Sequence, residues 1–251
     1  MHINSGAISR YVLQSCGGIK PAPTRIYASI GARKPCKTNK MPLYKNFFFD
    51  SHTQILVWKI TESYHQLFSE VVLNMKNRER LNGMKSELHQ RGFLSVRKLL
   101  QEAGFNDLDL YYDEFGKPHL SDDKFISITH SHEFSAIIIS DRPVGIDIEL
   151  HREKIVRIAD KFITAEVKYL TIDDLEEYIQ KLTVIWGTKE AIFKIQNEKG
   201  ISFKEHISVL PFELDRNKTT ANLNFGAVQK QFDVYYEAVE NFGLVYAFEK
   251  K

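Results

Sequence analysis

Two carboxylates stand two positions apart in residues 144–150 (VGIDIEL), where Asp147 and Glu149 alternate with apolar residues. Successive side chains of a β-strand point to opposite faces, so both acidic groups would share one face. Two strand positions span about 6.6 Å, which lets two carboxylates converge on one hard divalent cation. Gly145 would leave open space beside them. An edge strand with a solvated acidic face fits the same pattern.

A third acidic group occurs in residues 186–194 (WGTKEAIFK), which have the composition of a helix. Trp186, Glu190 and Lys194 are spaced i, i+4, i+8 and would form one stripe along it. A glutamate four residues before a lysine is also a common surface ion pair, worth only about 0.3 to 0.5 kcal/mol. Taken alone, this segment indicates no more than a solvated helix face.

Two further segments place a basic group beside turns or strand ends. Residues 116–118 (GKP) put Lys117 at a turn, where its charge can face a ligand. Residues 127–131 (SITHS) end a predicted strand, with His130 between hydroxyl-bearing residues. Each is typical of ordinary surface structure when met singly, and the two gain weight from occurring together with the carboxylates.

In the order GKP, SITHS, VGIDIEL and WGTKEAIFK, the sequence resembles the 4′-phosphopantetheinyl transferases, specifically the surfactin-synthetase-activating type. The spacings also fit, with 28 positions from Gly116 to Val144 and 41 from Glu149 to Glu190. The resemblance extends over roughly residues 41 to 251, and the sharp motifs lie within 116–195. The four-part combination is specific, whereas any single part is weak.

This resemblance implies that the phosphopantetheine arm of coenzyme A is transferred to a serine of an apo acyl or peptidyl carrier protein, releasing adenosine 3′,5′-bisphosphate. It implies a Mg²⁺ site made by Asp147, Glu149 and Glu190. Mg²⁺ would neutralise the pyrophosphate as charge develops on the leaving group. Glu190 is the expected general base, kept ionised by the cation and by Lys194, which would also act on the pyrophosphate.

The same resemblance assigns coenzyme A binding to three basic residues. His130 is expected at the 3′-phosphate, Lys117 at the adenine or phosphate end, and Lys194 at the pyrophosphate. Family members tend to place a further basic residue in the long helix of the first half. Arg91 and Arg97 are both available there, and the sequence does not choose between them.

Gly187 departs from the family pattern, because Ser, Thr or Cys often stands at this position. A glycine inside a helix costs about 1 kcal/mol, which predicts a looser helix there. Trp186 is expected to pack and orient the helix rather than to touch a ligand. The carrier protein is expected to be acidic and helical, which predicts a basic or apolar patch near Lys194.

The elements that must position these residues predict an α+β fold. Strands, two helices and strands occur twice, which suggests two similar α/β halves in a pseudo-twofold arrangement with the ligand at their junction. The expected halves are residues 41–140 and residues 141–251, the second carrying the magnesium site. Strands are predicted at 46–49, 54–60, 108–112, 125–130, 135–140, 144–150, 207–210, 223–225, 231–239 and 244–248, and helices at 63–72, 87–103, 166–170 and 177–197.

Residues 1–40 differ sharply in composition from the remainder. They hold seven of the 34 basic residues and none of the 32 acidic residues, so the remainder has a net charge of 27 − 32 = −5. We expect this segment to be disordered. It could be an extension upstream of a true start at Met41, which we favour, an organelle transit peptide, or a basic arm for an anionic partner.

Several classes of protein are disfavoured by composition. A negative body argues against nucleic-acid binding, and no apolar run approaches the roughly 18 residues of a membrane span. Two cysteines in 251 residues favour a reducing compartment, so a cytoplasmic location is expected. A monomer is expected because two halves of one chain could build the pocket without a partner subunit. The alternatives are a non-catalytic relative that binds coenzyme A or a carrier protein, and a Mg²⁺-dependent nuclease. Retention of the three carboxylates and Lys194 favours the enzyme.

Overall fold

The computed structural model describes residues 43–250, so the predictions for residues 1–40 lie outside the described range. Its first sheet is antiparallel, with strand order β1-β2-β6-β5. Its strands alternate or run apolar, as expected for a sheet covered by helices. They are β1 (Leu43–Asp50), β2 (Thr53–Lys59), β5 (Phe125–Ser131) and β6 (Phe134–Ser140).

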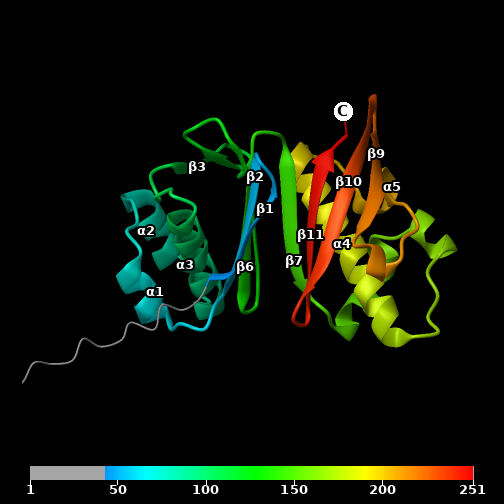
Figure 1. Ribbon diagram of the computed structural model, residues 1–251, viewed down its shortest axis with the longest axis horizontal. Helices are drawn as coiled ribbons and strands as arrows, with labels where there is room; N and C mark the ends of the chain where they lie inside the picture. The colour runs from blue at the N-terminus through cyan, green and yellow to red at the C-terminus, as the bar shows by residue number, and fades with distance from the viewer. Residues whose placement is uncertain (1–42, 251) are drawn as a thin grey trace, which may run out of the picture. The chain divides into compact units, whose positions relative to one another are not determined.

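Three helices, α1 (Tyr64–Glu70), α2 (Met75–Asn82) and α3 (Glu87–Glu102), accompany this sheet (Figure 1). Helix α1 begins as predicted after Ser63, whose side chain and that of Gln66 form a capping box. A two-stranded hairpin follows, formed by β3 (Leu110–Tyr112) and β4 (Pro118–Leu120).

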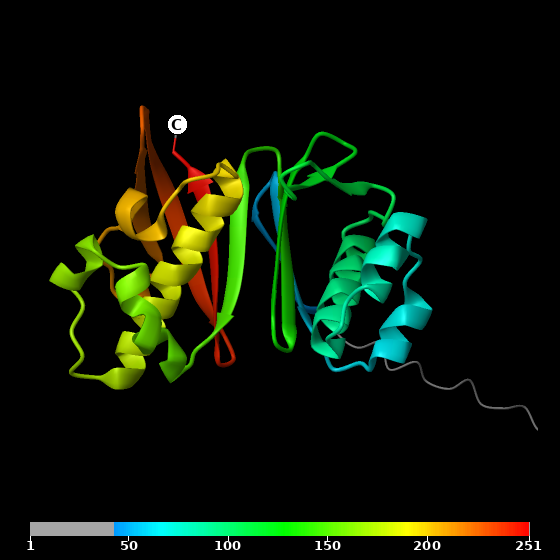
Figure 2. The same ribbon diagram turned by 180° about the vertical axis from the view of Figure 1, so that it is seen from behind.

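The second sheet is also antiparallel, with strand order β7-β11-β10-β9-β8. The long helix α4 (Leu175–Gln196) runs along it beside β7 (Figure 2). The strands are β7 (Val144–Leu150), β8 (Ile207–Val209), β9 (Lys218–Phe225), β10 (Val228–Val239) and β11 (Phe242–Glu249), and the shorter helical segments are η1 (Glu153–Lys161), η2 (Ala165–Lys168), α5 (Phe203–His206) and η3 (Leu214–Arg216).

Three clusters of buried apolar side chains hold these layers together. One lies between the first sheet and α1 to α3, and a second lies between the second sheet and α4. The third joins the two sheets, where Ile55 and Ile138 of the first pack with Ile146 and Ile148 of β7. The apolar face predicted for β7 is therefore confirmed.

A mixed α+β structure with antiparallel sheets is confirmed, with differences where the apolar pattern is weak. Helix α2 was not predicted because it buries only Asn77 and Leu81, too few for a clear period. Helix α4 matches the prediction of 177–197 within two residues at each end, and Asn197 takes the left-handed conformation that closes it. In the range that the structure describes, no helix is both long and apolar enough to cross a membrane.

Candidate functional site

Strand β7 places Asp147 and Glu149 on one face, opposite the isoleucines that enter the core between the sheets. Asp147 is only 4% exposed, and Glu149 is half-buried. The alternative of a solvated acidic face is therefore wrong, although β7 is an edge strand of its sheet. Helix α4 and strand β5 both lie against β7 and exclude water from it.

The open space expected beside Gly145 is filled by the backbone of α4. A Cβ atom at Gly145 would lie 2.0 Å from the carbonyl oxygen of Ala191, closer than any real contact. Gly187 likewise allows α4 to pack closely against the second sheet, since a Cβ atom there would lie 2.8 Å from Cγ2 of Val245 on β11. Gly187 is buried, so it lets the helix fit closely and does not loosen it, contrary to the prediction.

Glu190 of α4 lies close enough to the two carboxylates of β7 for all three to repel one another. Burial, together with Asp147 and Glu149, raises the pKa of Glu190 to about 7, against the lowering effect of Lys194. Burial and Asp147 likewise raise the pKa of Glu149. Lys194 thus lowers the pKa of Glu190, the direction expected, but burial and the two neighbouring carboxylates outweigh it in the protein alone.

Lys194 forms its ion pair with Asp147 on β7. Its ammonium donates to Asp147 Oδ1 at 2.8 Å and to the carbonyl oxygen of Ile146 at 2.9 Å. The other carboxylate oxygen, Asp147 Oδ2, is buried and has no hydrogen-bond partner among the described residues. A buried carboxylate oxygen without a partner lowers the stability of the fold unless a bound ligand interacts with it.

The donors present suit a hard cation such as Mg²⁺. Residues 43–250 contain no group of three His, Cys, Asp or Glu side chains already arranged to hold a metal ion. The ammonium of Lys194 instead supplies the positive charge beside Asp147. The site still combines an orphaned buried oxygen with two mutually repelling carboxylates, Glu149 and Glu190. All of these donors are carboxylate oxygens, the ligands that Mg²⁺ prefers.

A cavity of about 470 Å³ is connected to this site through Lys194, the ion-pair partner of Asp147, and residues of β5 and α4 both line it. Its walls carry an unusual number of basic side chains for a body of negative charge. They are Arg80, His89, Arg97, Lys117, His130 and Lys194. Apolar side chains of α3 and β5 supply much of the remaining wall, as is common in cofactor sites.

Lys117 and His130 line this cavity as predicted, in different settings. Lys117 Nζ donates to the carbonyl oxygen of Ile195 at 2.7 Å and so caps the last turn of α4. Burial lowers the pKa of Lys117. The His130 ring is open to the cavity, yet desolvation by its walls, with His89 and Lys194 nearby, lowers the pKa of His130.

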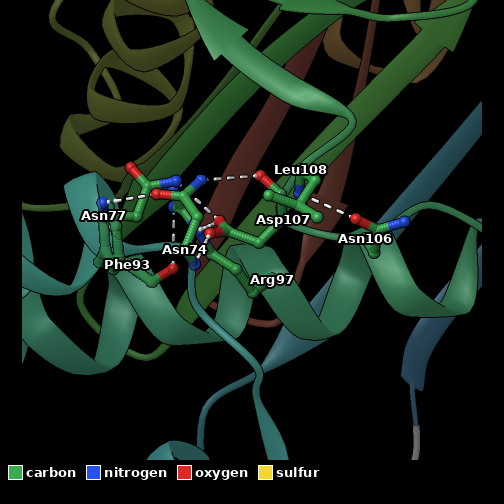
Figure 3. Close-up of polar contacts among 7 residues, drawn as sticks. All are labelled: Asn74, Asn77, Phe93, Arg97, Asn106, Asp107 and Leu108. Atoms are coloured by element: carbon green, nitrogen blue, oxygen red, sulfur yellow. Dashed lines mark hydrogen bonds and ion pairs between the residues drawn. The ribbon is translucent and has the colours of Figure 1, made fainter.

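Of the two arginines singled out on the long first-half helix, Arg97 lines the cavity, and its buried Nη2 has no hydrogen-bond partner among the described residues. Arg97 is 2% exposed; its Nε donates to Asp107 at 3.0 Å and its Nη1 to the Phe93 carbonyl oxygen (Figure 3). Asp107 also accepts from Asn74 and Asn77 at the start of α2, so the network ties α2 to α3.

Arg91 lies outside the cavity and donates to the carbonyl oxygen of Ile60. The cavity residues on the first-half helices that sequence reasoning missed are Arg80 and His89. Arg80 projects from α2, and its guanidinium lies 4.9 Å from the ring centroid of Tyr112. Only the basic character of residues 76–80 could have indicated it.

Glu149 lines a second, smaller cavity of about 160 Å³. Arg152 and Lys154 line it with apolar groups of η1, and Trp186 forms another part of its wall. Trp186 also packs edge-on against Phe162 and Phe203, which confirms a packing role.

The residue next to Glu190 anchors the helix from the opposite side. Lys189 is fully buried, and its ammonium lies 2.9 Å from a carboxylate oxygen of Glu166. It also donates to the carbonyl oxygens of Phe162 and Phe203. All three ammonium protons of Lys189 therefore have acceptors in the protein interior. This buried ion pair fixes the orientation of α4 about its axis, so that Glu190 faces β7.

Comparison with known proteins gives one family. Residues 143–246, from the start of β7 into β11, match the family model described as the 4′-phosphopantetheinyl transferase superfamily. The chain is 31% identical over 133 residues to 4′-phosphopantetheinyl transferase gsp of Aneurinibacillus migulanus, covering 51% of this chain and 54% of that protein. It is 31% identical over 100 residues to 4′-phosphopantetheinyl transferase Sfp of Bacillus subtilis (strain 168), covering 39% and 44%. The matched part thus spans about half the length of these curated relatives.

Proposed function

Because residues 143–246 match the model of the 4′-phosphopantetheinyl transferase superfamily, we propose that the chain transfers 4′-phosphopantetheine from coenzyme A to a serine of an apo acyl or peptidyl carrier protein. The observation that carries the proposal is the grouping of Asp147, Glu149 and Glu190, connected through Lys194 to a cavity lined by basic residues. Such a cavity suits the phosphates of coenzyme A, and the carboxylates suit a cation bound to its pyrophosphate.

Asp147, Glu149 and Glu190 would hold the Mg²⁺, which when bound neutralises charge on the pyrophosphate. Glu190 then takes the proton from the serine hydroxyl as its oxygen bonds to the β-phosphorus of coenzyme A. The bond from that phosphorus to the bridging oxygen breaks, and adenosine 3′,5′-bisphosphate leaves with the electron pair. Lys194 would turn from Asp147 to a pyrophosphate oxygen and stabilise that charge.

The two cavities would take the two substrates. The larger cavity, with Lys117 and His130, would hold the nucleotide part of coenzyme A. The smaller one, with Arg152 and Lys154 beside Glu149, would face the acidic carrier protein.

The proposal includes the finer architecture predicted from sequence. Residues 41–140 and 141–251 would be two similar halves in a pseudo-twofold arrangement, with coenzyme A at their junction. One chain would then build the whole site, so the active form would be a monomer, and its low cysteine content suits the cytoplasm. The competing proposal is a non-catalytic relative that binds coenzyme A or a carrier protein.

Intact mass measurement of apo carrier proteins tests the function directly. Incubation with the chain, coenzyme A and Mg²⁺ should add one arm of about 340 Da, the difference between coenzyme A and adenosine 3′,5′-bisphosphate. A carrier protein with its acceptor serine changed to alanine, and a reaction with chelator, are the controls. Binding of coenzyme A without any mass gain on fatty acid, polyketide or peptide carrier proteins would support the non-catalytic relative instead.

Replacing Lys194 by methionine is expected to change two affinities in opposite directions. The ammonium that competes with a cation for Asp147 is removed, so Mg²⁺ should bind the protein alone several-fold more tightly. The charge that would reach the pyrophosphate is also lost, so coenzyme A should bind at least about 10-fold more weakly. Calorimetry with each ligand separately measures both effects. Equal weakening of both would indicate general damage to the site.

Coenzyme A binding is expected to take up protons through His130. Desolvation lowers the pKa of His130 in the free protein, and a phosphate beside the ring would raise it. Between the free and bound pKa values binding therefore adds a proton, and affinity falls as pH rises through that window. Calorimetry in two buffers of different ionisation enthalpy measures the uptake. It should vanish with dephospho-coenzyme A and in His130→Gln, and persist in His89→Gln; persistence in His130→Gln would contradict the assignment.

A further inference from the structure

We propose that Thr129 is a positioning residue for the cation site, holding the carboxylate of Asp147 in one orientation, and that Ser131 does the same for Glu149. The inference rests on the proposed function, because it concerns the same carboxylates. It assigns a role to residues of the first sheet in a site whose ligands all come from the second half of the chain.

Strands β5 and β7 are edge strands of different sheets, and edge strands carry unpaired backbone groups. Hydroxyl side chains of β5 satisfy those groups on β7. Ser127 Oγ accepts from Ile146 N at 3.1 Å, and Thr129 Oγ1 accepts from Ile148 N at 3.3 Å. Residues 127, 129 and 131 share one face of β5, so the same alternation carries three hydroxyls along the acidic strand.

The direction of the Thr129 hydroxyl proton follows from its partners. Thr129 Oγ1 lies 3.1 Å from Asp147 Oδ1 and is only 7% exposed. The backbone N–H of Ile148 can only donate, so the hydroxyl oxygen must accept there. The single hydroxyl proton is therefore left for Asp147 Oδ1.

Asp147 Oδ1 consequently has two donors, Thr129 and Lys194, while Oδ2 has none among the described residues. Lys194 has a long flexible side chain and would leave for the pyrophosphate when substrate binds. Thr129 is β-branched and fixed on a strand, so its χ1 is stiff and it stays. It would keep Oδ1 occupied and leave Oδ2 aimed at the cation.

Ser131, two residues after Thr129 on β5, makes the equivalent contact with the next carboxylate of β7. Its Oγ donates to Glu149 Oε2 at 3.2 Å. Ser131 and Glu149 are both half-buried, so water competes more for this bond than for the one at Thr129. We therefore expect Thr129 to matter more than Ser131, in keeping with the general role of groups that orient metal ligands.

Metal binding to the protein alone tests the inference without relying on turnover. Thr129→Val keeps the shape of the side chain and removes its proton, and should weaken Mn²⁺ binding in calorimetry by about 10- to 100-fold. Thr129→Ser restores the hydroxyl and should recover most of the affinity. Ser131→Ala should have a smaller effect in the same direction.

Thr53→Val is the matched control. Thr53 is buried on β2, and its hydroxyl bonds to Ser140 Oγ at 2.8 Å, away from the carboxylates. It should lose stability but bind Mn²⁺ like the wild type. Unchanged binding by Thr129→Val, equal weakening by Thr53→Val, or no Mn²⁺ binding by the wild type would each overturn the inference. A chain that shows the expected Mn²⁺ pattern yet modifies no carrier protein refutes the proposed transfer alone.

Discussion

Glu190→Gln is expected to slow carrier-protein modification by about 10²- to 10⁴-fold, the usual contribution of a general base. Glutamine keeps the size of the side chain but cannot take the serine proton, and it is a weaker partner for Mg²⁺. Burial and the neighbouring carboxylates raise the pKa of Glu190 to about 7 in the protein alone, and a bound cation would lower it and keep Glu190 ionised as a base must be. The rate of mass gain on an apo carrier protein at saturating coenzyme A and Mg²⁺ is the measurement.

The same helix supplies the control for this variant. Glu177 lies in the first turn of α4, where its side chain is 49% exposed and pairs with Lys181. Glu177→Gln makes the same chemical change far along the helix and should leave the rate within about twofold, since exposed pairs contribute little. A Glu190→Gln variant as fast as Glu177→Gln would remove Glu190 from the reaction.

Gly145→Ala is expected to lower the free energy of unfolding by about 3 kcal/mol or more, at the upper end of overpacking effects. The added methyl group would overlap the backbone carbonyl of Ala191, lying 2.0 Å from its oxygen. Backbone atoms cannot rotate away, so α4 must move off β7 and carry Glu190 with it. Urea unfolding measures the stability, and Mn²⁺ calorimetry on any folded fraction measures the damage to the site.

Alanine substitutions at two other glycines serve as comparisons for the loss of stability in Gly145→Ala. At Gly187 the clash is with a methyl group of Val245, which can rotate, so Gly187→Ala should cost less. Gly83 ends α2 with a right-handed backbone and a nearest contact at 3.5 Å, so Gly83→Ala should change stability by under about 0.5 kcal/mol. If Gly145→Ala were as stable as Gly83→Ala, the close crossing of β7 and α4 would be wrong.

Local patterns in the sequence were enough to predict the faces of β7 and the start of α1. The alternation in residues 144–150 is a property of every strand, so the division between the isoleucines and the two carboxylates needed no knowledge of neighbours. The capping box at Ser63 is likewise made within four residues. The family resemblance extended this local information to the identity of the candidate site residues.

Partners and protonation were decided only by the tertiary structure. Helical spacing suggested that Lys194 serves Glu190, yet its ammonium bonds to Asp147, 47 positions away. The pKa of Glu190 depends on burial by β7, and the space beside Gly145 depends on the path of α4. Arg80 reaches the cavity from a helix that has almost no apolar pattern.

The physical reason is the separation in sequence between the residues that interact. Side-chain alternation and capping arise from bonds between residues close in the chain, so sequence alone determined which groups could act together. Desolvation, ion pairing and close packing arise from atoms that only folding brings near. Tertiary structure therefore decided which carboxylate meets the lysine, which arginine is locked in a network with Asp107, and which hydroxyls of β5 face the acidic strand.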